Sequence, residues 1–124
     1  MAKTVMLVDD SATMRKIIMK TIRMADVGVE EFKEASNGEE ALAKLAEGPV
    51  DVVLCDINMP VMNGAEFVKK ARANSDYDNV KILIVSTESS DDFIKSMMAD
   101  GANDYVTKPF TPEKIQTKLE PLLA

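Results

Sequence analysis

Short apolar runs alternate with longer segments of helical period along this chain, and this alternation limits the possible folds more than any other feature. The apolar runs are Thr4–Val8, Glu31–Ala35, Val50–Cys55, Val80–Val85 and Asn103–Val106. The third and fourth runs are nearly continuous and rich in Val and Ile, which is typical of strands buried on both faces of a parallel sheet. The second run is more polar, so we expect it near an edge of the sheet.

Between these runs, apolar residues recur every three or four positions, as on one face of an amphipathic helix. The residues expected to face a core are Met14, Ile17, Ile18, Ile22, Ala25, Ala41, Leu42, Leu45, Ala46, Phe67, Val68, Ala71, Phe93, Ile94, Met97, Met98, Ile115, Leu119, Leu122 and Leu123. Residues that favour helix ends flank these segments, among them Asn37 before the second, Gly101 after the fourth and Thr111-Pro112 before the fifth.

The resulting order of five strands and five helices predicts an α/β fold. Strict alternation favours a parallel sheet with right-handed crossovers and helices on both faces. We therefore expect a flavodoxin-like (βα)5 doubly wound sheet of strand order 2-1-3-4-5, in one domain that spans residues 1–124. In such a sheet, ligands bind beyond the carboxyl ends of the strands, at the topological switch point between strands 1 and 3.

Polar residues follow the apolar runs at those carboxyl ends. Asp9-Asp10 follows the first run, Asp56 the third, Ser86-Thr87 the fourth and, one residue further on, Lys108 the fifth. Carboxylates that converge repel one another, and Mg²⁺ is a suitable hard cation for a small oxygen-lined site. A carboxylate nucleophile beside a cation, a hydroxyl and an ammonium group suits in-line phosphoryl transfer onto an aspartate.

Composition excludes several classes of function. The formal net charge is −6, so the chain lacks the positive field that nonspecific nucleic-acid binding needs. It has no histidine, which removes imidazole-based catalytic triads and histidine-ligated zinc. Its single cysteine, Cys55, cannot form an intrachain disulfide and is expected to be a buried thiol. With no signal-peptide pattern and no long apolar run, we expect a cytoplasmic protein without membrane insertion.

Four motifs resemble the signature of the response-regulator receiver domain. They are Leu7-Val8-Asp9-Asp10, Asp56-Ile57-Asn58-Met59-Pro60, Val85-Ser86-Thr87-Glu88 and Lys108-Pro109-Phe110. Their order, spacing and positions at strand ends all fit, and the resemblance covers the whole chain. Residues 10–15 and 101–106 are most similar to the stand-alone, CheY-like members that serve chemotaxis.

The resemblance implies that Asp56 is the phosphoacceptor and becomes a 4-aspartylphosphate. It implies that Asp10 binds Mg²⁺ directly, Asp9 largely through water, and Asn58 through its backbone carbonyl. Without the other motifs, a strand-end aspartate would be interpreted as a turn or helix cap, and Asp9-Asp10 as the cap of the first helix.

The resemblance also assigns Ser86 and Lys108 to the phosphoryl oxygens. It implies a cis Lys108–Pro109 bond, and it makes Ser86 and Tyr105 a pair of switch residues. The alternative for Tyr105 is a half-buried ring that packs the edge strand. Both remain open at this point.

Asn58 and Glu88, each two residues beyond a site residue, resemble the positions that tune hydrolysis of the acyl phosphate in this family. The predicted function is that of a two-component response regulator, not an enzyme with a separate substrate. A sensor histidine kinase would phosphorylate Asp56, and a downstream protein such as the flagellar motor switch would respond. A phosphatase is a possible further partner. The alternative is a non-chemotaxis receiver, or a receiver excised from a larger regulator.

Three other functions fit less well. Haloacid-dehalogenase-type phosphatases carry a second aspartate two residues after the nucleophile, where this chain has Asn58. A flavodoxin-like FMN carrier needs a phosphate-binding loop after the first strand, where this chain has Asp9-Asp10. A docking module that is never phosphorylated would not need the complete set of polar residues.

Overall fold

The expected strands form one parallel sheet in the order β2-β1-β3-β4-β5. The computed structural model describes residues 3–87 and 90–124. The strands are β1 (Lys3–Val8), β2 (Val29–Ala35), β3 (Val52–Asp56), β4 (Lys81–Ser86) and β5 (Asp104–Thr107). The helices are α1 (Ala12–Ala25), α2 (Gly38–Glu47), α3 (Gly64–Arg72), α4 (Asp91–Asp100) and α5 (Pro112–Leu123), with a short 3-10 helix at Ser75–Tyr77. This confirms the predicted fold class and strand order, and the polar β2 lies at an edge.

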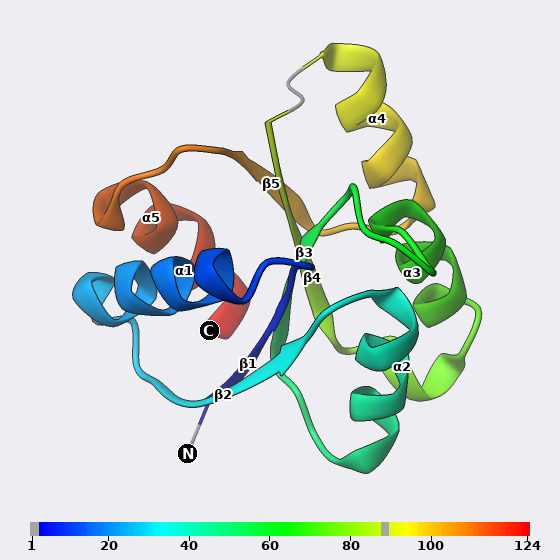
Figure 1. Cartoon of the computed structure of the whole chain (residues 1–124), viewed down its shortest axis with the longest axis horizontal. Coiled ribbons are helices and arrows are strands. Elements are labelled where there is room, and N and C mark those ends of the chain that lie inside the picture. Colours follow the sequence, from blue (N-terminus) through cyan, green and yellow to red (C-terminus); the bar gives the residue numbers. More distant parts are fainter. Residues whose placement is uncertain (1–2, 88–89) are drawn as a thin grey trace.

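The helices cover both faces of the sheet (Figure 1). Helices α1 and α5 pack together on one face, whereas α2, α3 and α4 lie on the other, with α3 in contact with both α2 and α4. The crossover from β1 to β2 passes through α1 on one face, and the crossover from β2 to β3 passes through α2 on the other. The order of the strands therefore reverses between β1 and β3, which is the point where ligands bind in such a sheet.

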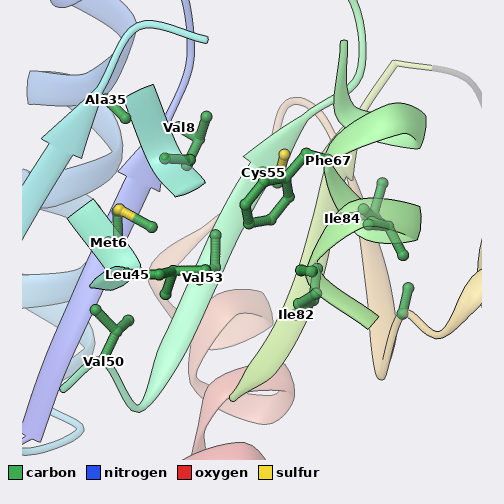
Figure 2. Close-up of a cluster of buried hydrophobic side chains, with 14 of the residues drawn as sticks. Met6, Val8, Ala35, Leu45, Val50, Val53, Cys55, Phe67, Ile82 and Ile84 are labelled. Atoms are coloured by element: carbon green, nitrogen blue, oxygen red, sulfur yellow. The ribbon is translucent and has the colours of Figure 1, made fainter. Parts of the chain in front are cut away.

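Strand side chains alternate between two separate cores. In β1, Met6 and Val8 face the α2–α3–α4 side, while Val5 and Leu7 face the α1–α5 side. The same period of two runs through β3 and β4, as expected for strands covered on both faces. Figure 2 shows the first of these cores, in which the Phe67 ring of α3 lies close to Cys55 and is fully buried.

Side-chain caps explain where the helices begin. In each of the five α-helices, the residue before the first turn is Ser, Asn or Thr, and its side chain accepts a backbone N–H three residues later, which satisfies a donor that the helix leaves unpaired. These capping residues are Ser11, Asn37, Asn63, Ser90 and Thr111. Gly101 ends α4 with a φ of 119°, as predicted from its position.

Three of the predicted core positions are wrong. Ile17 is 53% exposed and Met98 is 40% exposed, and Ala46 is also exposed. Each lies next to a truly buried residue of the same helix, at the border of its apolar stripe. Helical period identifies the direction of the buried face but not its width, because the width depends on how closely the neighbouring helix approaches.

None of the helices in the described ranges has the length and apolar character needed to cross a membrane.

Candidate functional site: a carboxylate cluster at the carboxyl edge of the sheet

Three carboxylates from two adjacent strands meet where the sequence predicted. Asp9 and Asp10 follow β1, and Asp56 is the last residue of β3. One carboxylate oxygen of each lies within 4.8 Å of the others. Asp9 is buried, with 3% exposed, whereas Asp10 is exposed and Asp56 is partly buried. The cluster therefore has a closed inner side and an open outer side.

Lys108, which directly follows β5, contributes a positively charged ammonium group to the cluster. Its Nζ lies 3.2 Å from Asp9 Oδ2 and 3.6 Å from Asp56 Oδ1. The Lys108–Pro109 peptide bond is cis, as the resemblance implied. Among the described residues, only the Lys108 ammonium group pairs with these three carboxylates, so the cluster has an excess of negative charge when they are ionised. The oxygen-only donor set and this charge fit a divalent cation.

The backbone fixes Asp9 firmly. Its N–H donates to Ala35 O at 3.1 Å, which continues the β1–β2 ladder beyond the strand. Its Oδ1 accepts the Ser11 N–H at 2.9 Å, while Oδ2 takes the ion pair with Lys108. Both oxygens of this buried carboxylate are thus engaged, and its position does not depend on packing alone.

Burial raises the pKa of Asp56, because a partly desolvated carboxyl resists ionisation, and the nearby Asp9 carboxylate adds to this. The Lys108 ammonium and the Ile57 N–H, which donates to Asp56 Oδ1 at 2.8 Å, oppose the rise. A divalent cation beside Asp56 would favour the ionised form further.

Ser86 and Tyr105 lie on the same face of the sheet. Ser86 ends β4 and is 5% exposed, and its carbonyl accepts the Lys108 N–H at 2.8 Å. Tyr105 pairs with Ile84, which is two residues before Ser86 and therefore points the same way. The Tyr105 ring is half-buried, and Lys118 Nζ lies 5.0 Å from its centroid.

The loop after Asp56 folds back against the end of β3. Gly64 N–H donates to Ile57 O, and a Cβ on Gly64 would lie 2.3 Å from Asp56 O. Only glycine allows this approach. The structure places Asn58 in this loop with an exposed side chain. The predicted hydrolysis-tuning residue Glu88 lies outside the described residues.

Cys55 precedes Asp56 but does not join the site. Its side chain is fully buried in the core of Figure 2, as the sequence predicted. Burial raises the pKa of this thiol, so it stays protonated near neutral pH.

Residues 5–120 match the family model described as "Response regulator receiver domain". The chain belongs to the response regulator receiver family. A receiver is a phosphoacceptor switch, and the match includes the carboxyl end of every strand described above.

Curated relatives of this receiver include two chemotaxis proteins. One is "Chemotaxis protein CheY1" of Helicobacter pylori, 40% identical over 119 residues that cover 95% of this chain and 94% of the relative. Another is "Chemotaxis protein CheY homolog" of Campylobacter jejuni, 41% identical over 119 residues, with 95% and 90% covered. A solved structure of the chemotaxis response regulator CheY4 of Vibrio cholerae is 39% identical, covers 99% of this chain and 100% of its own, and has a TM-score of 0.88.

Sequence reasoning missed one residue that contacts the receiver site. Arg15 of α1 donates from Nη1 to Asp9 O and from Nε to Glu34 Oε1 at 3.0 Å. Arg15 belongs to the segment of residues 10–15 that resembles CheY-like receivers, but an arginine in a helix is usually interpreted as a solvent-exposed charge. Only the crossing of α1 over β1 and β2 shows the contact.

Proposed function

We propose that the chain is a chemotaxis response regulator whose Asp56 accepts a phosphoryl group from a sensor histidine kinase. The single observation that carries the proposal is the meeting of Asp9, Asp10, Asp56 and Lys108 at one sheet edge. The chemotaxis setting is supported by the relatives, which match nearly the whole length of the chain. We also propose that the receiver unit extends over residues 1–124, since β1 begins at Lys3 and α5 ends at Leu123.

Mg²⁺ is the cation that we propose for the carboxylate cluster. Asp10 and Asp56 would hold it directly, Asp9 largely through water, and Asn58 through its backbone carbonyl. When bound, Mg²⁺ neutralises charge on the carboxylates and on the incoming phosphoryl group. The donor set is all oxygen, which suits this ion and excludes softer metals by preference.

Phosphoryl transfer places a carboxylate oxygen of Asp56 in line with the donor's scissile bond. The new O–P bond forms as the bond from phosphorus to the donor histidine nitrogen breaks, and the histidine leaves with its electron pair. Lys108 and the Ser86 hydroxyl bind phosphoryl oxygens, where they stabilise charge in the transition state. The chain catalyses both this step and the later attack of water on phosphorus, which restores the Asp56 carboxylate.

Ser86 and Tyr105 couple the site to the surface. Attraction of Ser86 toward the phosphoryl oxygens would leave space on the face that it shares with Tyr105. The half-buried ring can then move inward, which changes the surface near β5. Asn58 and Glu88 are proposed to set how fast water reaches the acyl phosphate.

The proposed partners are a chemotaxis histidine kinase, a phosphatase, and a downstream protein such as the flagellar motor switch. The acidic balance of the chain gives no reason to add nucleic acid to this set. Phosphorylation changes charge and shape at one edge of the sheet, so we expect affinity for the downstream protein to change with it.

Incubation with Mg²⁺ and acetyl phosphate tests the acceptor directly. The intact mass of the native chain should gain one phosphoryl group, and the gain should require Mg²⁺. Asp56→Asn should abolish it, while the matched control Asp100→Asn, at the far end of α4, should retain it. An added phosphoryl group that survives in Asp56→Asn refutes the assignment.

A further inference from the structure

Arg15 connects the carboxylate cluster to β2, which is an edge strand of the sheet. Its guanidinium donates from Nη1 to Asp9 O, and its Nε lies 3.0 Å from Glu34 Oε1. The Arg15 side chain is 15% exposed and that of Glu34 is 42% exposed. Planar guanidinium groups suit such a double contact, since their donors lie in a fixed fork. Lys108 meets Asp9 through the carboxylate, so the two cations hold different atoms of the same residue.

The carbonyl that Arg15 binds belongs to the peptide unit between Asp9 and Asp10. A peptide unit is planar, so a hydrogen bond to its oxygen restricts the orientation of the whole plane. That orientation sets the direction in which Asp10 leaves the backbone. Asp10 is exposed, so side-chain packing holds it weakly and the backbone carries most of its placement. Asp9, in contrast, is already held through both carboxylate oxygens.

We propose that Arg15 is a positioning residue for the divalent-cation site, and that Glu34 in turn orients Arg15. The inference rests on the proposed function in so far as the carboxylate cluster takes up Mg²⁺. In this arrangement Arg15 does not touch the cation. It fixes the Asp9–Asp10 peptide, so that the Asp10 carboxylate points toward Asp56 before the cation arrives.

Two effects of Arg15 on cation binding have opposite signs. Its positive charge repels a cation, which weakens binding, whereas its hold on the peptide pre-organises a ligand, which strengthens binding. The pairing with Glu34 offsets the charge, and solvent at the open side of the site screens what remains. Loss of a residue that orients a metal ligand typically weakens affinity by about 10–100-fold. We therefore expect the positioning effect to dominate.

Calorimetric titration with Mg²⁺ separates the two effects. The variants are Arg15→Met and the matched control Lys16→Met, which removes the same charge from the neighbouring exposed position of α1. We expect Arg15→Met to raise the Kd for Mg²⁺ by about tenfold. Lys16→Met should leave the Kd unchanged or slightly lower, because it removes only a screened repulsion.

Glu34→Gln is a second variant that keeps Arg15 and is less disruptive to folding. It should raise the Kd in the same direction as Arg15→Met, by about half as much on a logarithmic scale or less. Thermal unfolding in metal-free buffer provides the structural control. A residue that only stabilises the fold would lower the unfolding temperature and leave the Kd unaltered.

The proposal is overturned if Arg15→Met and Glu34→Gln both bind Mg²⁺ as tightly as Lys16→Met. It is also overturned, together with the proposed metal site, if the native chain takes up no Mg²⁺. If Mg²⁺ binds and the affinities follow the expected order, but acetyl phosphate leaves Asp56 unmodified, the positioning role stands and the phosphoacceptor function fails. Rates of phosphorylation add a further readout, since saturating Mg²⁺ should restore the rate of Arg15→Met.

Discussion

The role proposed for Asp56 requires an ionised carboxylate, but the surroundings of this side chain disfavour ionisation. Partial burial raises its pKa, and the Asp9 carboxylate raises it further. Lys108 supplies partial relief at 3.6 Å, and a divalent cation would supply the rest. Because a bound cation stabilises the ionised form, we expect the proposed reactivity of Asp56 to depend on occupancy of the metal site.

Asp56→Asn should make the folded chain more stable at neutral pH in metal-free buffer. Because the pKa of Asp56 is raised in the folded state, that state binds more protons than the unfolded state as pH rises from the ordinary value of 3.8 through the raised folded value. The native chain therefore loses stability relative to Asp56→Asn across this window, and the difference is constant above it.

Urea unfolding of both chains in EDTA, at several values from about pH 4 to 7, measures this difference. Asp100→Asn serves as the control for removal of a negative charge elsewhere. A native chain that gains stability over Asp56→Asn as pH rises would show that Lys108 outweighs burial.

The loop between β3 and α3 contains a residue in an unfavourable conformation. Val61 has a φ of 67°, in the left-handed region, and its side chain is 74% exposed. A β-branched residue is strained there, and little apolar burial compensates for the strain. The loop that follows Asp56 is thus held in its shape by its neighbours, among them the Gly38 N–H, which donates to Met62 O at 2.9 Å.

Val61→Asn should stabilise the chain by about 1 kcal/mol, because asparagine tolerates the left-handed region. Val61→Thr keeps the branched Cβ and should give no gain. Midpoints of urea unfolding measure both. Equal stability of native chain and Val61→Asn would mean that the loop changes conformation instead of releasing strain.

Arg72 joins several elements at the other end of the sheet. Its guanidinium donates to Tyr77 O and Val80 O, which precede β4, and to Gly101 O, which follows α4. It also donates to Asn103 Oδ1, which in turn accepts the Ile82 N–H. One side chain thus ties α3 to the start of β4 and to the turn between α4 and β5.

Arg72→Met should destabilise the chain by about 2–3 kcal/mol, because it leaves several carbonyl groups without their charged donor. Lys70→Met, at an exposed position of the same helix, should change stability by about 0.5 kcal/mol or less. Chemical unfolding compares the two. A cost for Arg72→Met no greater than that of Lys70→Met would show that water replaces the guanidinium without penalty.

Cation binding should appear as added stability of the entire fold. A ligand that binds only the folded state, at a concentration about a hundredfold above its Kd, adds about 2.7 kcal/mol. We expect this increment from Mg²⁺ in the native chain and its loss in Asp10→Asn, which lacks a proposed ligand of the ion. Because Asp10 is exposed, the substitution alone should cost little stability. Unfolding in EDTA and in Mg²⁺ gives both values. An equal increment in Asp10→Asn would locate the bound ion elsewhere.

The strand-end residues were predictable because two simple rules place them. Period-two and period-3.6 patterns identify the elements, and the crossover rule brings the carboxyl ends of parallel strands to one edge. Asp9, Asp10, Asp56, Ser86 and Lys108 all follow from this reasoning. Asn37 and Thr111 were predictable as capping residues because a cap acts within three residues of its own position. The alternative of Asp9-Asp10 as the cap of the first helix is wrong, since Ser11 caps α1.

Features that depend on approach between distant elements were not predictable. Ile17 is exposed because it lines an open pocket between α1 and the segment after β5, together with Pro109 and Phe110. The contact of Arg15 with Glu34 depends on how α1 crosses β2. The left-handed φ of Val61 opposes local preference, so local reasoning would place another residue there. In each case tertiary structure decides what local pattern leaves open.

The two apolar layers on opposite faces of the sheet share backbone but no side chains. Because the sheet separates the two layers, energetic coupling between substitutions on its two faces should be small. Substitutions in one layer should therefore need no compensating substitutions in the other. A substitution in the α2–α3–α4 layer should leave the packing of the α1–α5 layer unchanged, although both layers support the same row of strand ends.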